Sequence, residues 1–270
     1  MAKIKNKTAF FIVTPSYNQA QFIEETIGSV LNQKGDFDIH YFVADGGSSD
    51  GTKKILSEFS SKLTFVSEKD RGQTDAINKG IKHFKKLEKK YDNTYFAYIN
   101  SDDYYLPGAF QAVVKNFKEN AERMWLVGDT KIIDEKGGEI QEPVRLYKKL
   151  WRTLFFLNLL YILNPIPQPA TFLRWQAVEK IGKFDESLSY TMDYQYWLRA
   201  IQKVGKPLFI PDTLAAFRIH GSSKGGSLFL NQFKEQYQTA KNLTTNRLLL
   251  SLHLCHNFIT ISVYKLLKAS

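Results

Sequence analysis

Short apolar runs alternate with segments of helical periodicity throughout the first half of the chain. The apolar runs predict strands, and the segments between them, whose apolar positions recur every three or four residues, predict helices. The predicted strands are 9–13, 41–44, 63–66 and 95–99, and the predicted helices are about 21–31, 50–59, 74–87 and 107–117. This alternation predicts an α/β fold, in which a mostly parallel central sheet is flanked by helices on both faces.

The second half of the chain is less regular. Its apolar pattern predicts a strand at 125–128, a hairpin over 130–140 and, further on, the strands 170–173, 209–210 and 214–218. Helices are predicted at 175–181 and 193–204, and a helical pattern returns from about residue 227 to the end. We therefore expect one large domain over 1–225, made of the halves 1–120 and 121–225, followed by a helical extension over 226–270.

Each of the four strands predicted in the first half ends in a polar loop. The loops read TPSYN at 14–18, DGGSSDG at 45–51, EKDRG at 68–72 and NSDD at 100–103. The carboxyl ends of parallel strands lie at one edge of a sheet, where ligands bind in folds of this type. Loops are polar in general, but turn chemistry explains glycine and asparagine and does not explain repeated aspartates. The sequence therefore predicts one continuous site along this edge.

Charge and composition narrow the class of ligand. The chain has 270 residues and a formal net charge of +10, which favours an anionic partner. Within this basic chain Asp102 and Asp103 are adjacent, and two neighbouring carboxylates repel each other unless a cation is close. The basic residues are scattered and are not interleaved with aromatic residues in one stripe, so we expect no nucleic-acid partner.

Several common nucleotide-binding and metal-binding motifs are absent from the sequence. The first strand-to-helix turn has neither G-x-G-x-x-G nor a P-loop pattern, and the chain contains no C-x-x-C or H-E-x-x-H. These absences give no support to dinucleotide binding or to a zinc site. Cys255 is the only cysteine, so no internal disulfide can form, which fits a reducing compartment and an expected cytoplasmic location.

Five motifs, in order, resemble those of a known enzyme family. They are TPSYNQ, VADGGSSDGT, SEKDRGQTDAINKG, YINSDDYYLPGA and GKFDESLSYTMDYQYWLRA, and the resemblance covers about Phe10 to Lys224. In these motifs the chain is similar to the inverting GT-A glycosyltransferases of family 2, which include bacterial enzymes of cell-surface polysaccharide assembly. The resemblance implies the GT-A (nucleotide-diphospho-sugar transferase) fold, with 1–120 as the nucleotide-sugar-binding half, 121–225 as the acceptor-side half and 226–270 as a helical extension.

The resemblance assigns a divalent cation, Mn²⁺ or Mg²⁺, to the paired aspartates. Mg²⁺ is often held by one or two carboxylates together with substrate phosphates. By resemblance, Asp103 ligates the metal and Asp102 contacts the ribose or the metal shell. His220 is expected to ligate the metal or to hydrogen-bond the diphosphate, and Arg218 or Lys224 to pair with a phosphate. The alternative that the two aspartates cap the helix that follows stays open.

The first three loops are expected to bind the nucleotide. By resemblance, Asp45 accepts a hydrogen bond from the uracil N–H group, whereas Asp50 is expected to cap the next helix. The other expected contacts to base, ribose or phosphate come from the first and third loops, and they are Thr14, Pro15, Tyr17, Asp70 and Arg71.

Asp193 is the expected catalytic base. The family's acidic pair appears here as Met192-Asp193, so the aspartate is kept and the preceding acid is lost. In inverting transfer one base removes the proton of the acceptor hydroxyl as that hydroxyl attacks the anomeric carbon, and one carboxylate suffices. A helix N-cap is the alternative role for Asp193. Gln168 and Glu186 are minor candidates for contacts to the acceptor.

The resemblance implies transfer of a hexosyl group from a nucleotide-sugar, most simply a UDP-sugar, to a glycan or lipid-linked saccharide. A sugar nucleotidyltransferase and an inactive nucleotide-sugar-binding module are the alternatives. Two apolar segments with basic flanks, 151–163 and 247–268, predict peripheral contact with the inner face of the cell membrane. Packing of these segments on the core, or on a second subunit in a homodimer, is the other interpretation.

Overall fold

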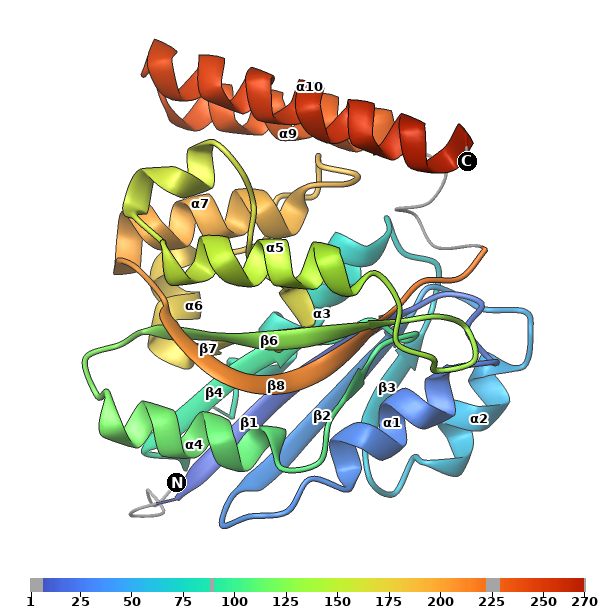
Figure 1. Ribbon diagram of the computed structural model, residues 1–270. Helices are drawn as coiled ribbons and strands as arrows, with labels where there is room; N and C mark the ends of the chain where they lie inside the picture. The colour runs from blue at the N-terminus through green and yellow to red at the C-terminus, as the bar shows by residue number, and fades with distance from the viewer. Residues whose placement is uncertain (1–6, 88–89, 222–228, 270) are drawn as a thin grey trace.

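A mixed sheet forms the centre of the fold. In the computed structural model, which describes residues 7–87, 90–221 and 229–269, eight strands are ordered β3–β2–β1–β4–β7–β6–β8–β5 (Figure 1). The strands are β1 (Thr8–Ser16), β2 (Asp38–Asp45), β3 (Thr64–Ser67), β4 (Asn93–Tyr98), β5 (Tyr104–Tyr105), β6 (Trp125–Ile133), β7 (Thr171–Arg174) and β8 (Leu208–Arg218). β1 pairs in parallel with β2 and β4, and β2 with β3, so the first four strands have the predicted parallel arrangement. β7 runs antiparallel between β4 and β6.

Helices cover both faces of this sheet. Alternate residues of a strand point to opposite faces, so in β1 Phe10 and Ile12 enter one apolar cluster while Phe11 and Val13 enter the other. The helices of the first cluster are α1 (Ile23–Leu31), α2 (Thr52–Glu58) and α4 (Ala109–Glu119). Those of the second are α3 (Gln73–Phe84), α6 (Trp175–Ile181) and α7 (Met192–Val204). The predicted α/β fold is confirmed.

Two predictions for the second half hold only in part. The hairpin expected over 130–140 forms only beside its turn, where the Ile140 N–H donates to the Ile132 carbonyl at 2.8 Å. β7 pairs with β6 only over Trp125–Val127 and does not occupy this part of its edge. The turn itself is present, with the Asp134 N–H donating to the Gly138 carbonyl at 2.8 Å, but the returning chain makes an isolated bridge and no strand in this described segment. The two short strands expected at 209–218 are one strand, β8, which shifts register along β6.

Helix α5 (Glu142–Thr153) follows β6 and packs on it through charged side chains. The buried carboxylate of Asp129 accepts hydrogen bonds from Arg145 Nε at 2.9 Å and from Arg152 Nη2 at 2.5 Å. Lys148 stands three and four residues from these arginines, on the same side of the helix. The basic side of α5 therefore faces the molecule, and several of its leucines are exposed.

The chain ends in two helices that lie beside each other over α5 and α7 (Figure 1). α9 (Phe229–Leu243) places Ala240 in the apolar cluster of α7. α10 (Arg247–Ala269) places His253 Nδ1 2.8 Å from the carbonyl of Tyr161, which ends the 3-10 helix η2 (Leu157–Tyr161). Across the three described stretches, no helix combines the length and the apolar character needed to cross a membrane. The expected domain boundary at 225/226 lies outside the described residues.

Candidate active site

Hydrogen bonds join the loops that follow β1 and β2. The Asn18 N–H donates to Ser48 Oγ at 2.7 Å. The carboxylate of Asp50 accepts from the N–H groups of Ala20 at 2.9 Å and Thr52 at 3.1 Å. Asp50 thus holds the start of α2 and ties it to the first loop, in agreement with the structural role expected for it.

Asp45 ends β2, and its carboxylate is buried. One oxygen accepts from Ser67 Oγ at 2.6 Å and from the Ser48 N–H at 3.0 Å, and the Ser48 hydroxyl donates to the other oxygen. The carboxylate therefore fastens the turn after β2 to the end of β3. Its expected contact with a nucleotide base stays a prediction, because a base would have to share oxygens that already accept hydrogen bonds.

Strand β1 is longer than predicted, and this changes the positions of two expected donor contacts. Thr14 and Pro15 are buried inside the strand, and Thr14 Oγ1 lies 2.9 Å from the hydroxyl of Tyr41 in β2. The expected contact of Thr14 with the donor stays a prediction. Tyr17, 63% exposed, does project from the first loop. Sequence reasoning missed Ser16, whose buried Oγ has no hydrogen-bond partner among the described residues.

Asp70 and Arg71 follow β3 and differ in their surroundings. Asp70 accepts a hydrogen bond from the Gly72 N–H at 2.8 Å, and a Cβ atom at Gly46 would lie 3.1 Å from its carboxylate. Asp70 therefore packs against the glycine turn that follows Asp45. Arg71 is 74% exposed and pairs with Glu186 at 2.6 Å and with Asp75 at 3.2 Å, so two carboxylates already balance its charge.

The paired aspartates lie in different environments. Asp103 is 0% exposed, and its Oδ1 accepts a hydrogen bond from the Arg218 N–H at 2.9 Å. Asp102 is partly exposed, and its Oδ2 lies 3.0 Å from His220 Nε2. Burial, followed by the neighbouring Asp102 carboxylate, raises the pKa of Asp103 well above its usual value. The structure thus places Asp102, and not the expected Asp103, beside His220.

Arg218 braces this loop from β8. Its guanidinium donates to the carbonyls of Asp102 and Glu135, both at 3.0 Å, and pairs with Glu25 of α1. The group lies under the ring of Phe22, with 5.0 Å between the guanidinium carbon and the ring centroid. Because its side chain is 4% exposed, Arg218 is committed to protein contacts and is not available to a phosphate as expected. Lys224, the other candidate for that contact, lies outside the described residues.

Asp102 and His220 are the side chains that fit a divalent cation. No set of three or more His, Cys, Asp or Glu side chains in the described stretches is arranged to hold a metal ion by itself. A carboxylate with an adjacent imidazole can supply two ligands, and substrate phosphates and water can supply the others.

Asp193 lies in the first turn of α7 and is half-buried. Thr191 occupies the N-cap position, and Asp193 Oδ1 accepts the N–H of the adjacent Tyr194 at 2.7 Å, so Asp193 is not the helix N-cap. Burial raises the pKa of Asp193. The positive charge of Lys148 on α5 lowers that pKa in part, and the negative charge of Glu235 on α9 adds to it.

Tyr98, the last residue of β4, connects the two acidic parts of the site. Its buried phenol has a pKa raised well above the usual value, first by burial and then by the charges of Asp193 and Asp103. The phenol is therefore within electrostatic reach of both carboxylates. The structure brings the paired aspartates and Asp193 to the same edge of the sheet, around the end of β4.

The two minor candidates for acceptor contacts are already engaged. Gln168, which begins the 3-10 helix η3 (Gln168–Ala170), donates through Nε2 to the Tyr98 carbonyl at 2.7 Å. Glu186 accepts from Asn78 Nδ2 at 3.0 Å in addition to pairing with Arg71. Both side chains hold the surroundings of Tyr98 and α3 in place.

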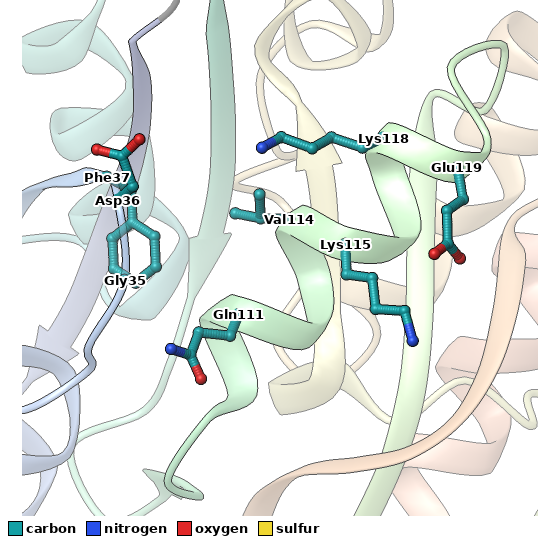
Figure 2. A pocket seen from close by; sticks show the side chains of 8 residues that line it. All are labelled: Gly35, Asp36, Phe37, Gln111, Val114, Lys115, Lys118 and Glu119. Atoms are coloured by element: carbon teal, nitrogen blue, oxygen red, sulfur yellow. The ribbon is translucent and has the colours of Figure 1, made fainter.

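A separate pocket of about 380 Å³ lies at the other end of the strands (Figure 2). It is formed between residues 35–37, which precede β2, and one side of α4, where Gln111, Lys115 and Lys118 project. Because these residues precede β2, the pocket faces away from the edge that carries the aspartates. We therefore place the candidate active site at the aspartate edge.

Comparisons with known proteins agree with this fold. The family model described as Glycosyl transferase family 2 matches residues 11–182, more than half of the chain. An uncharacterized glycosyltransferase of Rickettsia prowazekii is 29% identical over 259 residues, which cover 92% of this chain and 77% of the relative. Among solved structures, S. aureus TarS 1-349 in complex with UDP-GlcNAc aligns with a TM-score of 0.67 at 16% identity, over 93% of this chain and 72% of that one. The mannosyltransferase PcManGT from Pyrobaculum calidifontis, in complex with GDP-Man and Mn²⁺, aligns with a TM-score of 0.60 at 14% identity, over 98% and 81%.

Proposed function

The chain belongs to glycosyl transferase family 2 and is a glycosyltransferase, and we propose that it transfers a sugar from a nucleotide-sugar to an acceptor hydroxyl with inversion at the anomeric carbon. The observation that carries this proposal is that the buried phenol of Tyr98, at the end of β4, lies within electrostatic reach of both Asp103 and Asp193. A leaving diphosphate held at the aspartates and an acceptor activated at Asp193 would thereby meet at one point.

The donor lies, in this proposal, across the loops that follow β1, β2 and β3. Tyr17 is exposed beside them and offers a flat surface to a base or ribose. Asp45 and Asp70 line the glycine turn between these loops. The TarS and PcManGT complexes contain UDP-GlcNAc and GDP-Man, so both uridine and guanosine donors are candidates for this chain.

We assign the divalent cation, Mn²⁺ or Mg²⁺, to Asp102 and His220. When bound, it supplies positive charge to the diphosphate oxygens as the glycosidic bond breaks. Asp103 positions this loop through its hydrogen bond with the Arg218 N–H, and Arg218 fixes the Asp102 backbone. This assignment moves the metal from Asp103, where the family resemblance put it, to Asp102.

Asp193 takes the proton of the acceptor hydroxyl. The acceptor oxygen forms its bond to the anomeric carbon on the face opposite the diphosphate, the bond from that carbon to the phosphate oxygen breaks, and the nucleoside diphosphate leaves with the electron pair. A carboxylate whose pKa is raised is a stronger base than an ordinary aspartate, which suits this role. One carboxylate is enough because no covalent sugar–enzyme intermediate is formed.

A thermal-shift screen followed by a turnover assay tests the proposal. UDP-GlcNAc, GDP-mannose and related donors are added with Mn²⁺ or with EDTA. The effective donor should raise the melting temperature of the protein when Mn²⁺ is present and should not raise it when EDTA is present. Asp193→Asn should keep this shift while release of nucleoside diphosphate falls by about 10²–10⁴-fold. Asp212→Asn, at an exposed carboxylate on β8, is the matched control and should turn over normally.

The products separate the proposal from its alternatives. Release of nucleoside diphosphate that stops on chelation supports metal-dependent glycosyl transfer. Release of pyrophosphate would instead identify a nucleotidyltransferase, and tight donor binding without any product would identify an inactive binding module. Normal turnover by Asp193→Asn would show that the base has been assigned wrongly.

We also propose that the outer side of α5 and α10 contacts an anionic membrane and presents a lipid-linked acceptor. Tyr147 of α5 lies 2.9 Å from His256 of α10, so the two helices meet. Their exposed large apolar side chains, with those just after α5, are Leu146, Tyr147, Leu150, Leu154, Phe156, Leu157, Leu248, Leu252, Leu254, Phe258, Ile259 and Val263. The inner sides of the same helices pack on the core. Packing on the core and contact with a membrane are therefore compatible, because they use opposite faces of these helices.

Co-sedimentation with lipid vesicles tests the membrane contact. The protein should bind vesicles that contain phosphatidylglycerol and should bind pure phosphatidylcholine weakly, because its net charge is +10. Phe258→Asp, at a side chain 73% exposed, should reduce binding, whereas Ser60→Asp, near the end of α2, adds the same charge far from this surface and should not. If both variants bind the vesicles equally, the proposed membrane contact is wrong, and the proposed glycosyl transfer is not affected.

A further inference from the structure

The helix that carries Asp193 is held at its start by a residue of the C-terminal extension. Glu235 of α9 accepts hydrogen bonds from the backbone N–H groups of Ser189 at 3.1 Å, Tyr190 at 2.8 Å and Thr191 at 2.8 Å. The hydroxyl of Thr191 also donates to it, at 2.9 Å. One carboxylate therefore gathers four donors from the three residues that enter α7.

This contact replaces the capping that a helix usually obtains locally. Thr191 is at the N-cap position, yet its side chain makes no capping hydrogen bond to α7 and points to Glu235 and to Thr239 Oγ1, 3.2 Å away. Asp193 itself accepts the N–H of Tyr194. The orientation of the first turn therefore depends on a carboxylate that follows Asp193 by more than forty residues in the chain.

A second contact holds the same turn of α7 from the side of α3. Thr74 of α3 donates its hydroxyl to the sulfur of Met192 at 2.8 Å. Met192 stands where the resemblance expects an acid, so this side of the turn carries no charge of its own. Glu235 contributes negative charge near the start of α7, and this charge raises the pKa of Asp193.

We propose that Glu235 is a positioning residue for the catalytic base, through which the C-terminal helices set the placement of Asp193. This inference rests on the proposed function, since it takes Asp193 to be the base. It extends that function by giving the helical extension a part in catalysis in addition to any role in membrane contact. Charged and titratable groups face Asp193 from three neighbouring elements: Lys148 on α5, Tyr98 on β4 and Glu235 on α9.

The test compares Glu235→Gln with Asp185→Asn in the full-length protein. Glutamine keeps the size of the side chain but loses the charge, and its NH₂ group cannot accept the backbone N–H groups. Asp185 is a suitable control because its carboxylate also holds this connecting segment, but through bonds to Ser187 within its own turn. Turnover is followed as release of nucleoside diphosphate from UDP-GlcNAc or GDP-mannose, whichever gives the larger thermal shift.

Three results are expected for Glu235→Gln. Amide hydrogen exchange should increase at residues 189–191, kcat should fall by about 10- to 100-fold while the KM for the donor changes little, and the acid limb of the kcat profile should move to lower pH. The limb moves down because loss of a negative charge beside Asp193 favours its ionised form. Asp185→Asn should alter none of the three.

The outcomes distinguish this inference from the proposed function. If Asp193→Asn is inactive while Glu235→Gln shows faster exchange but an unchanged kcat and pH profile, Glu235 is only structural and the inference alone is overturned. If Asp193→Asn is active, the base assignment and the inference both fall. If Glu235→Gln unfolds below the assay temperature, Thr191→Val replaces it; this variant keeps the carboxylate and loses one donor, and an unchanged kcat would overturn the inference.

Discussion

Replacement of Asp129 by asparagine should be among the most destabilising conservative changes in this chain. Asp129 lies in β6 and is 2% exposed, and it accepts from both arginines of α5. Asparagine keeps the shape but removes the charge, so Arg152, whose side chain is 7% exposed, becomes a buried cation without a counter-ion. Arg152 keeps one other acceptor, the Pro165 carbonyl at 3.1 Å, which is neutral.

The magnitude follows from the unequal burial of the two arginines. Breaking a buried ion pair from one side costs about 3–5 kcal/mol. Arg145 contributes little of this, because it also pairs with Glu139 at 2.6 Å and is partly exposed. For a domain of this size each kcal/mol lowers the melting temperature by about 2–4 °C, so we expect a fall of roughly 6–20 °C.

Urea and thermal unfolding of Asp129→Asn and Glu139→Gln measure this effect. Glu139 is the matched control, because it is also a carboxylate partner of Arg145 but its side chain is 37% exposed. Glu139→Gln should cost no more than about 1 kcal/mol, and this small loss should shrink at high salt. If the two variants lose equal free energies of unfolding, the argument that burial of Arg152 sets the cost is refuted.

The other predictions concern packing, proton affinity and metal binding. Gly80→Ala should lower the free energy of unfolding by about 1–3 kcal/mol, because its Cβ would lie 2.3 Å from a side chain of β1; Gly28→Ala, with its nearest neighbour at 3.8 Å, should be neutral or stabilising in urea unfolding. Lys148→Met removes the cation that lowers the pKa of Asp193, so that pKa should rise and the acid limb of the kcat profile should move to higher pH. Asp102→Asn should raise the Mn²⁺ concentration needed for the donor-induced thermal shift by about tenfold or more.

Lys148→Met and Asp102→Asn each have a control variant at an exposed position. Lys149→Met, on the outer side of α5, should leave the pH profile unchanged, and Asp36→Asn, on the far pocket, should leave the Mn²⁺ titration unchanged. An acid limb that moves to lower pH in Lys148→Met would show that Lys148 does not act on Asp193 through its charge. A normal Mn²⁺ titration for Asp102→Asn would show that Asp103, and not Asp102, is the metal ligand.

The first half of the fold could be predicted from sequence because its signals are local. Each strand alternates with a helix of clear period, and each strand ends in small or acidic residues, so the edge that carries Asp45, Asp70 and the paired aspartates follows from the pattern alone. The second half could not be predicted as well, because strand pairing decides it. Nothing in residues 130–140 indicates that the chain returning from the turn makes only an isolated bridge, between Ile133 and Glu139, and no strand.

The individual roles in the site were less predictable than its position. A motif shows that two aspartates are adjacent, but burial by β8 decides that Asp103 turns to the Arg218 N–H while Asp102 meets His220. The end of β1 was predicted too early for a similar reason, since β1 extends to Ser16 and includes Thr14. These are contacts between residues far apart in the chain, which leave no local pattern.

The charges that set the pKa of Asp193 come from different parts of the chain than the loops proposed to bind the nucleotide-sugar. Lys148 and Glu235 act on it with opposite sign, and both come from helices that follow the first half of the chain. The donor loops, by contrast, all follow strands of the first half. In the proposed mechanism, substitutions of Lys148 or Glu235 should therefore change the pH range of turnover without disturbing the nucleotide contacts.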